Sequence, residues 1–120
     1  MHVYEQARGR WTTPEGIVGM GYSGNGIWKN NPDCQSVEGH GPIPIGIYTI
    51  GPAHSDLKLG PCVMALTPDA TNTMFGRSAF FVHGDDIAHP GDGSDGCIVM
   101  PPEFRENMIA TSSDRRLQVV

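Results

Sequence analysis

Residues 80–100 read Phe-Phe-Val-His-Gly-Asp-Asp-Ile-Ala-His-Pro-Gly-Asp-Gly-Ser-Asp-Gly-Cys-Ile-Val-Met. His83 closes one apolar run and Cys97 opens another. The runs 79–83 and 97–100 have the length of short buried strands, and the loop between them is rich in Gly, Asp and Pro. The segment therefore predicts two strands that bring an imidazole and a thiol into one site.

The rest of the chain favours a small, mostly β domain. Its 120 residues suit a single domain spanning 1–120, and the apolar runs that persist between 16 Gly and 10 Pro indicate a turn-rich β fold. Further strands are expected at 2–8, 16–22, 43–50, 62–66 and 116–120. One helix is expected over 101–110, because a proline pair opens it and Phe104, Met108 and Ile109 supply an apolar stripe.

Charge and hydropathy exclude several classes of function. A net charge of −5 with few, scattered basic residues argues against nucleic acid and against an anionic membrane surface as partners. No stretch approaches the ~20 apolar residues of a membrane span. Residues 1–8 lack an apolar h-region, so no cleaved secretory signal is expected. The protein then works in the cytoplasm, leaves by another route, or has been trimmed.

The chain has three cysteines, and an odd number leaves at least one thiol free. Cys34 and Cys62 either pair in an oxidising compartment, leaving Cys97 as the reactive thiol, or behave as small buried hydrophobes. Both alternatives fit the sequence.

A cysteine nucleophile needs a nearby base, and His83 is the candidate because imidazole titrates near neutral pH. The backbone N–H groups of Gly96 and Cys97 are candidates for an oxyanion hole, and Ser94 for a hydrogen bond within the loop or to substrate. The group that orients the His83 ring stays open. The candidates are a backbone carbonyl and the side chains of Asp85, Asp86, Asp92 and Asp95.

A metal site is a rival interpretation of the same segment. His83, His89 and Cys97 are all possible ligands, and the acidic loop offers oxygen ligands without the spacing of an EF-hand. This alternative predicts a metal-dependent hydrolase.

Two motifs carry a resemblance to a known family. Ser94-Asp95-Gly96-Cys97-Ile98, following His83-Gly84, resembles the signature of the YkuD-type L,D-transpeptidases. Residues 41–50, Gly-Pro-Ile-Pro-Ile-Gly-Ile-Tyr-Thr-Ile, resemble the Pro-x-Gly-x-Tyr/Phe strand that precedes the catalytic segment in that family. Within the family, residues 75–85 and 96–100 look most like type VI secretion effectors with an L,D-transpeptidase-like domain.

The resemblance implies a small β-sandwich-like fold with one short helix after the cysteine, and an L,D-carboxypeptidase or L,D-transpeptidase that needs no cofactor. Cys97 would be the nucleophile and His83 the base, with Ser94 and Gly96 shaping the loop and the oxyanion hole. The substrate would be a peptidoglycan stem tetrapeptide, cleaved after meso-diaminopimelate or exchanged at its terminal D-alanine. Such an effector travels without a signal peptide and acts in the periplasm of a target bacterium. Its partners would be secretion-system components and a cognate immunity protein.

Two departures from the family pattern affect the expected substrate pocket. Asp95 stands where the family has His, and Val99 stands where it often has Arg. Arg77 is the candidate replacement for that carboxylate clamp, although a solvated arginine fits equally well. These departures also keep open an alternative, a catalytically weak module that binds peptidoglycan. The predicted substrate-binding residues are Arg77, Asp95, Gly84 and Tyr48, although for Tyr48 the sequence favours a core role over one in the pocket.

Overall fold

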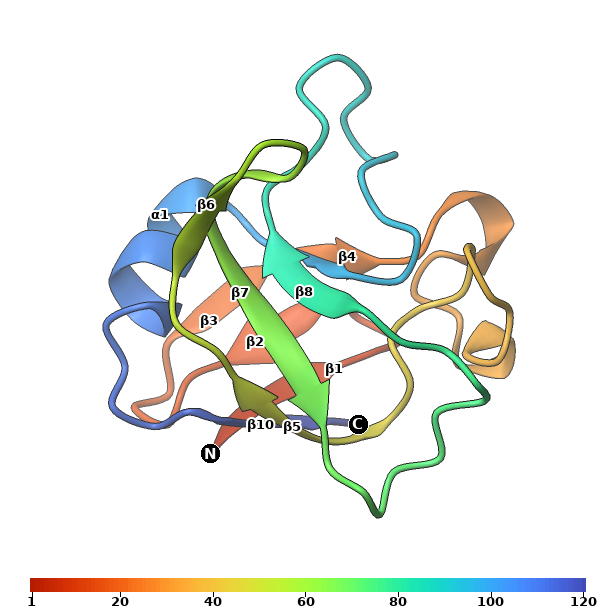
Figure 1. The fold of residues 1–120 in the computed structure, drawn as a ribbon, viewed down its shortest axis with the longest axis horizontal. Coiled ribbons are helices and arrows are strands. Elements are labelled where there is room, and N and C mark those ends of the chain that lie inside the picture. Colours follow the sequence, from red (N-terminus) through yellow and green to blue (C-terminus); the bar gives the residue numbers. More distant parts are fainter.

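The computed structural model describes residues 1–120 as one strongly curled sheet with a short helical segment packed against it (Figure 1). The strands are β1 His2–Glu5, β2 Arg10–Thr12, β3 Val18–Met20, β4 Tyr22–Ser23, β5 Gly46–Ile50, β6 His54–Asp56, β7 Gly60–Pro68, β8 Phe80–His83, β9 Ile98–Val99 and β10 Arg116–Val119. The helical elements are the 3-10 turns η1 Gly26–Trp28 and η2 Pro32–Cys34, helix α1 Pro102–Phe104 and the π-helical segment η3 Arg105–Ile109. The prediction of a mostly β fold with one short helix is confirmed.

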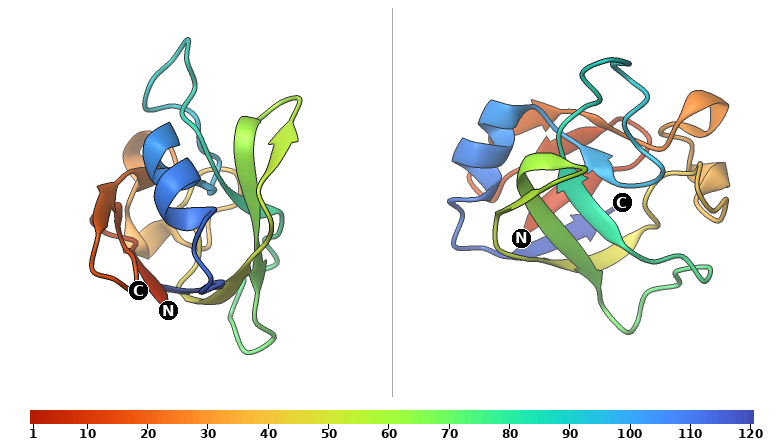
Figure 2. Two further views of the ribbon diagram at one scale, coloured as in Figure 1. Left: turned by 90° about the vertical axis from the view of Figure 1, so that its left-hand side faces the viewer. Right: turned by 45° about the horizontal axis from the view of Figure 1, so that its top comes forward.

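The sheet is nearly closed. Its strand order is β3-β2-β1-β10-β5-β7-β8-β9-β4, with β6 paired to β7 outside this path. The pairs β1–β10 and β8–β9 are parallel and the others are antiparallel. The strands at the two ends of the path, β3 and β4, are separated in the chain by Gly21 alone, so the two edges must meet. Figure 2 shows the sheet curling from the N-terminal strands on one side to β7 on the other.

Gly21 is the point at which the sheet closes. A Cβ atom at this position would lie 1.8 Å from the carbonyl oxygen of Val99 and 2.6 Å from the sulfur of Met100. Its own N–H donates to the carbonyl of Gly9 at 2.7 Å. This close approach splits the strand predicted over 16–22 into β3 and β4.

The core lies inside the curled sheet. Alternate residues of β7, β8 and β9 face inward, among them Met64, Val82 and Ile98, each fully buried. The predicted helix over 101–110 is confirmed in position and buries Phe104 and Ile109, but it is π-helical from Arg105 onward.

Two short strands, β2 and β6, were not predicted from the sequence. Each has three residues, too few to show an alternating pattern. The strand predicted over 43–50 begins at Gly46, while Ile43 is fully buried ahead of it.

No helix of the structure has the length and apolar character needed to cross a membrane.

We expect Gly21→Ala to lower the free energy of unfolding by about 3 kcal/mol, because the new methyl group overlaps main-chain atoms of the neighbouring strand. Urea denaturation measures the change. Gly51→Ala is the matched control, since its Cβ would make ordinary contacts with Ala65 at 3.4 Å or more. Equal stabilities of the two variants would contradict the closure described here.

Candidate active site

The parallel pairing of β8 and β9 places His83 and Cys97 on the same face of the sheet. Val82 pairs with Ile98 and His83 with Val99, so Cys97 lies level with Phe81. Because side chains alternate along a strand, His83 and Cys97 lie on the face opposite the core-facing Val82 and Ile98, where His83 is itself buried. Strand geometry sets the Cα atoms of His83 and Cys97 about 8 Å apart. The adjacency expected for 79–83 and 97–100 is therefore present.

The His83 ring is oriented by a main-chain carbonyl. Its Nδ1 lies 2.7 Å from the oxygen of Gly84, and an N–H donating there leaves Nε2 as the ring's free proton acceptor. Of the alternatives left open by the sequence, the structure selects the carbonyl and not a neighbouring aspartate. Gly84 was predicted to bind substrate. In the structure its carbonyl oxygen instead accepts the hydrogen bond from His83.

Burial lowers the pKa of His83 below its ordinary value. The hydrogen bond to Gly84 opposes this shift, Arg105 reinforces it, and Asp85 and Asp56 oppose it more weakly. The Arg105 guanidinium packs against Gly84, the residue after His83: a Cβ atom on Gly84 would lie 3.0 Å from its Nη1. The imidazole is therefore neutral near pH 7, which is the form that a general base needs.

The Cys97 thiol is partly exposed and lies near the start of β8, whereas His83 is the last residue of that strand. Its sulfur lies 3.8 Å from the carbonyl oxygen of Ala79, a residue held at φ +63°. Burial raises the pKa of Cys97 and the Asp95 carboxylate adds to the rise, while the Phe81 amide and Arg77 oppose it. Both groups are therefore neutral at rest, and no hydrogen bond joins them: the Cys97 sulfur contacts the carbonyl of Ala79, and the His83 ring bonds to the carbonyl of Gly84.

Ser94 organises the loop that carries Cys97. Its buried hydroxyl accepts hydrogen bonds from the amides of Gly24 at 2.9 Å and Gly96 at 3.0 Å, and donates to the carbonyl of Cys97 at 2.5 Å. The Gly96 amide therefore bonds within the loop. Of the two amides predicted to form an oxyanion hole, only that of Cys97 stays a candidate. Gly96 adopts φ +137°, and a Cβ there would lie 2.4 Å from Nη2 of Arg77.

Residues 23–25, which begin with the last residue of β4, support this loop, and their role was not predicted. The Ser23 hydroxyl donates to the carbonyl of Gly96 at 2.7 Å, and the Asn25 amide donates to that of Ser94 at 2.9 Å. In sequence, residues 23–26 indicate a turn and nothing more. Serine and asparagine readily bond to main-chain groups, but the sequence does not say which ones.

Arg77 is buried and bonded entirely to main-chain oxygens. Its two Nη atoms donate to the carbonyls of Gln35, Pro42, Gly41 and Asp95 over 2.7–3.2 Å. All four Nη–H groups are therefore used, and none is left for a substrate carboxylate. The structure favours Arg77 as the link between residues 35–42 and the Cys97 loop, in place of the predicted clamp.

A pocket of about 220 Å³ opens beside the thiol. Its lining residues are Glu38, Gly39, Arg77, Ser78, Ala79, Phe80, Asp95 and Cys97. Asp95, predicted to bind substrate, is therefore in its wall. Tyr48 is not, because its ring is fully buried in the core and its hydroxyl donates to the carbonyl of Pro44 at 2.7 Å. Tyr48 thus has the core role that the sequence favoured, and its placement among the substrate-binding residues was wrong.

The alternative metal site lacks an assembled ligand set. No three His, Cys, Asp or Glu side chains lie close enough together to hold an ion. His89 is exposed on the 84–96 loop, where its Nδ1 lies 3.9 Å from Asp86. Cys34, Cys62 and Cys97 are all free thiols in the structure.

Comparison with known proteins yields one match. Residues 18–120 match the model of a family described as the Tlde1 domain. No curated protein and no solved structure matches the chain. The matched range contains His83, Cys97 and the supporting residues 23–25.

Arg77→Met is expected to lower the free energy of unfolding by about 3 kcal/mol, because it leaves buried carbonyls without donors. Chemical denaturation measures the loss. Arg8→Met removes a side chain that is 67% exposed and should change stability by no more than about 0.5 kcal/mol. A fully stable Arg77→Met protein would restore the clamp hypothesis.

The His83 imidazole should titrate below its ordinary pKa of about 6.5. Its base form then persists as the pH falls through 6.5, and activity should decline only below that point. NMR titration of the ring and the acid limb of the pH–rate profile test this. Protonation above pH 6.5 would contradict the assigned environment.

Proposed function

Because this chain belongs to the Tlde1 domain family of type VI secretion effectors with L,D-transpeptidase activity, we propose that it is a cysteine-dependent L,D-carboxypeptidase or L,D-transpeptidase of peptidoglycan stem tetrapeptides. Cys97 is the nucleophile and His83 the general base. Domain 1–120 carries the complete site.

The proposal rests on the strand register. His83 and Cys97 lie on the same face of two adjacent parallel strands, and the hydrogen bond from Nδ1 to the Gly84 carbonyl leaves Nε2 as the proton acceptor. A thiol, an imidazole and a group that orients the imidazole are the components that cysteine catalysis requires, and proton transfer needs the thiol and Nε2 to approach within hydrogen-bond distance when substrate binds.

In the acylation step, the Cys97 sulfur attacks the carbonyl carbon of meso-diaminopimelate, and the thiol proton passes to His83 Nε2. The carbonyl oxygen becomes an oxyanion, for which the Cys97 amide is the nearest candidate donor. When the C–N bond breaks, His83 returns the proton to the departing amine of D-alanine. The product is a thioester on Cys97 and free D-alanine.

In the second step, water or the amino group of a D-amino acid attacks the thioester, and His83 again accepts the proton. The Cys97 sulfur leaves as a thiolate and recovers this proton. Water gives the tripeptide, which is carboxypeptidase activity, and the amine gives an exchanged tetrapeptide. Asp95 stands in the pocket wall, where it is placed to influence which peptides bind.

The biological setting follows from the family. The protein would be delivered by the secretion apparatus to the periplasm of a competing bacterium, and a cognate immunity protein would protect the producer. Its target would be the cell wall.

A second candidate function is supported by the state of the thiol. Because burial and Asp95 raise the pKa of Cys97, the nucleophile is not ionised at rest. A weakly active module that binds peptidoglycan has the same features. Turnover of muropeptides distinguishes the enzyme from the binding module.

Incubation of purified protein with tetrapeptide muropeptides should yield tripeptides, or exchanged tetrapeptides when a D-amino acid is supplied, as measured by liquid chromatography and mass spectrometry. Cys97→Ala should reduce turnover by at least about 10³-fold. Cys34→Ala is the matched control, because it removes a thiol outside the site. A folded wild-type protein that binds muropeptides unchanged would support the binding module instead.

A further inference from the structure

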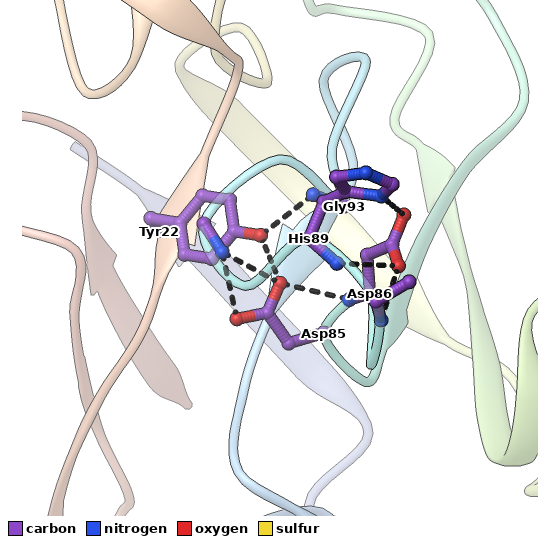
Figure 3. A network of polar contacts seen from close by, with 7 residues as sticks. Tyr22, Asp85, Asp86, His89 and Gly93 are labelled. Carbon is purple, nitrogen blue, oxygen red and sulfur yellow. Dashed lines mark hydrogen bonds and ion pairs between the residues drawn. The ribbon is translucent and has the colours of Figure 1, made fainter.

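The phenol of Tyr22 joins the two arms of the 84–96 loop. Its hydroxyl donates to Oδ1 of Asp85 and accepts from the amide of Gly93 at 2.8 Å, as Figure 3 shows. Asp85 follows His83 by two residues, and Gly93 precedes Cys97 by four. One oxygen atom therefore links the chain leaving His83 to the chain approaching Cys97.

Asp85 extends this link across the base of the loop. Its carboxylate accepts from the Gly91 amide at 3.1 and 3.2 Å and from the amide of Asp86 at 2.8 Å. The ammonium of Lys29 lies 4.5 Å from the centre of the Tyr22 ring. The bridge thus consists of a phenol, a carboxylate and three main-chain amides, with a cation against the ring.

Tyr22 is itself fixed to the sheet that carries both reacting groups. It pairs with Val99 across β4 and β9, and Val99 pairs with His83 across β9 and β8. Tyr22, Val99 and His83 therefore form one row across three neighbouring strands. The position of the phenol oxygen is therefore set relative to His83 through two adjacent strand pairings.

The other anchors of the loop act on one arm only. Ser23, Gly24 and Asn25 bind the main chain or side chain of residues 94–96, next to Cys97. Within the segment 22–25, Tyr22 alone also bonds to the arm that leaves His83. Loss of the Tyr22 hydroxyl would remove the hydrogen bond to the arm that leaves His83. The arm that approaches Cys97 would keep its bonds to Ser23, Gly24 and Asn25.

We propose that Tyr22 is a positioning residue: by tying Asp85 to Gly93 it holds His83 and Cys97 at the spacing needed for proton transfer between them. This inference rests on the proposed function only for the roles of these two residues, and not for the identity of the substrate. The bridge is partly exposed, so its removal should affect reactivity more than stability.

Alkylation of Cys97 by iodoacetamide tests the proposal without any peptidoglycan. The rate is followed by mass spectrometry of the Cys97 peptide as a function of pH. Near pH 7 the thiol depends on His83 for its proton transfer, and Tyr22→Phe should react about 10-fold more slowly than wild type. At a pH high enough to ionise the thiol directly, the two rates should converge.

Tyr4→Phe is the matched control. It also removes one phenol oxygen, from a buried hydroxyl that has no hydrogen-bond partner, and it should alkylate like wild type at every pH. Asp85→Ala removes the bridge from the other side and should reproduce the slow reaction at neutral pH. The double variant Tyr22→Phe/Asp85→Ala should be no slower than the slower single variant, since both break one bridge.

Three results would overturn the proposal: an unchanged rate in Tyr22→Phe, a rate reduced equally at neutral and high pH, or additive losses in the double variant. Failure of the proposed function has a different signature. In that case muropeptides stay intact, while the pH-dependent difference between Tyr22→Phe and wild type is still measured.

Discussion

The parallel pairing of β8 with β9 is the constraint on which the site depends. Parallel neighbours cannot be joined by a tight turn, so the chain must travel back along the strand before it pairs again. Residues 84–97 make this return, and the 84–96 loop rises above the strands (Figure 1). The register sets His83 and Cys97 on one face, and the long return supplies the polar groups that surround them.

Closure of the sheet supplies the support for this loop. Gly21 lets β4 pair with β9, and residues 22–25 then lie beneath the loop that carries Cys97. Arg77 joins the same loop to residues 35–42 through four carbonyls. The thiol is therefore held by segments from three distant parts of the chain, none of which contributes a reacting atom.

Local features of the sequence predicted the strands now seen at Phe80–His83 and Ile98–Val99 and the helix after Pro101, because apolar runs and proline positions are local properties. The catalytic pairing of Cys97 with His83 stays a prediction. Properties set by distant contacts were not predicted. Arg77 was a candidate ligand clamp, yet three of its carbonyl partners lie 35–42 residues earlier in the chain and the fourth, Asp95, lies 18 residues later. A core role was favoured for Tyr48, but the position of β5 between β10 and β7 is not a local property of the sequence.

In the proposed mechanism, Cys97 forms a thioester with the substrate while His83 moves the proton. Mass spectrometry of protein quenched in acid during turnover of a tetrapeptide detects this thioester. We expect a tripeptide adduct on the Cys97 peptide of the wild-type protein and none in His83→Ala. Turnover without any adduct, or an adduct on Cys34 or Cys62, would contradict it.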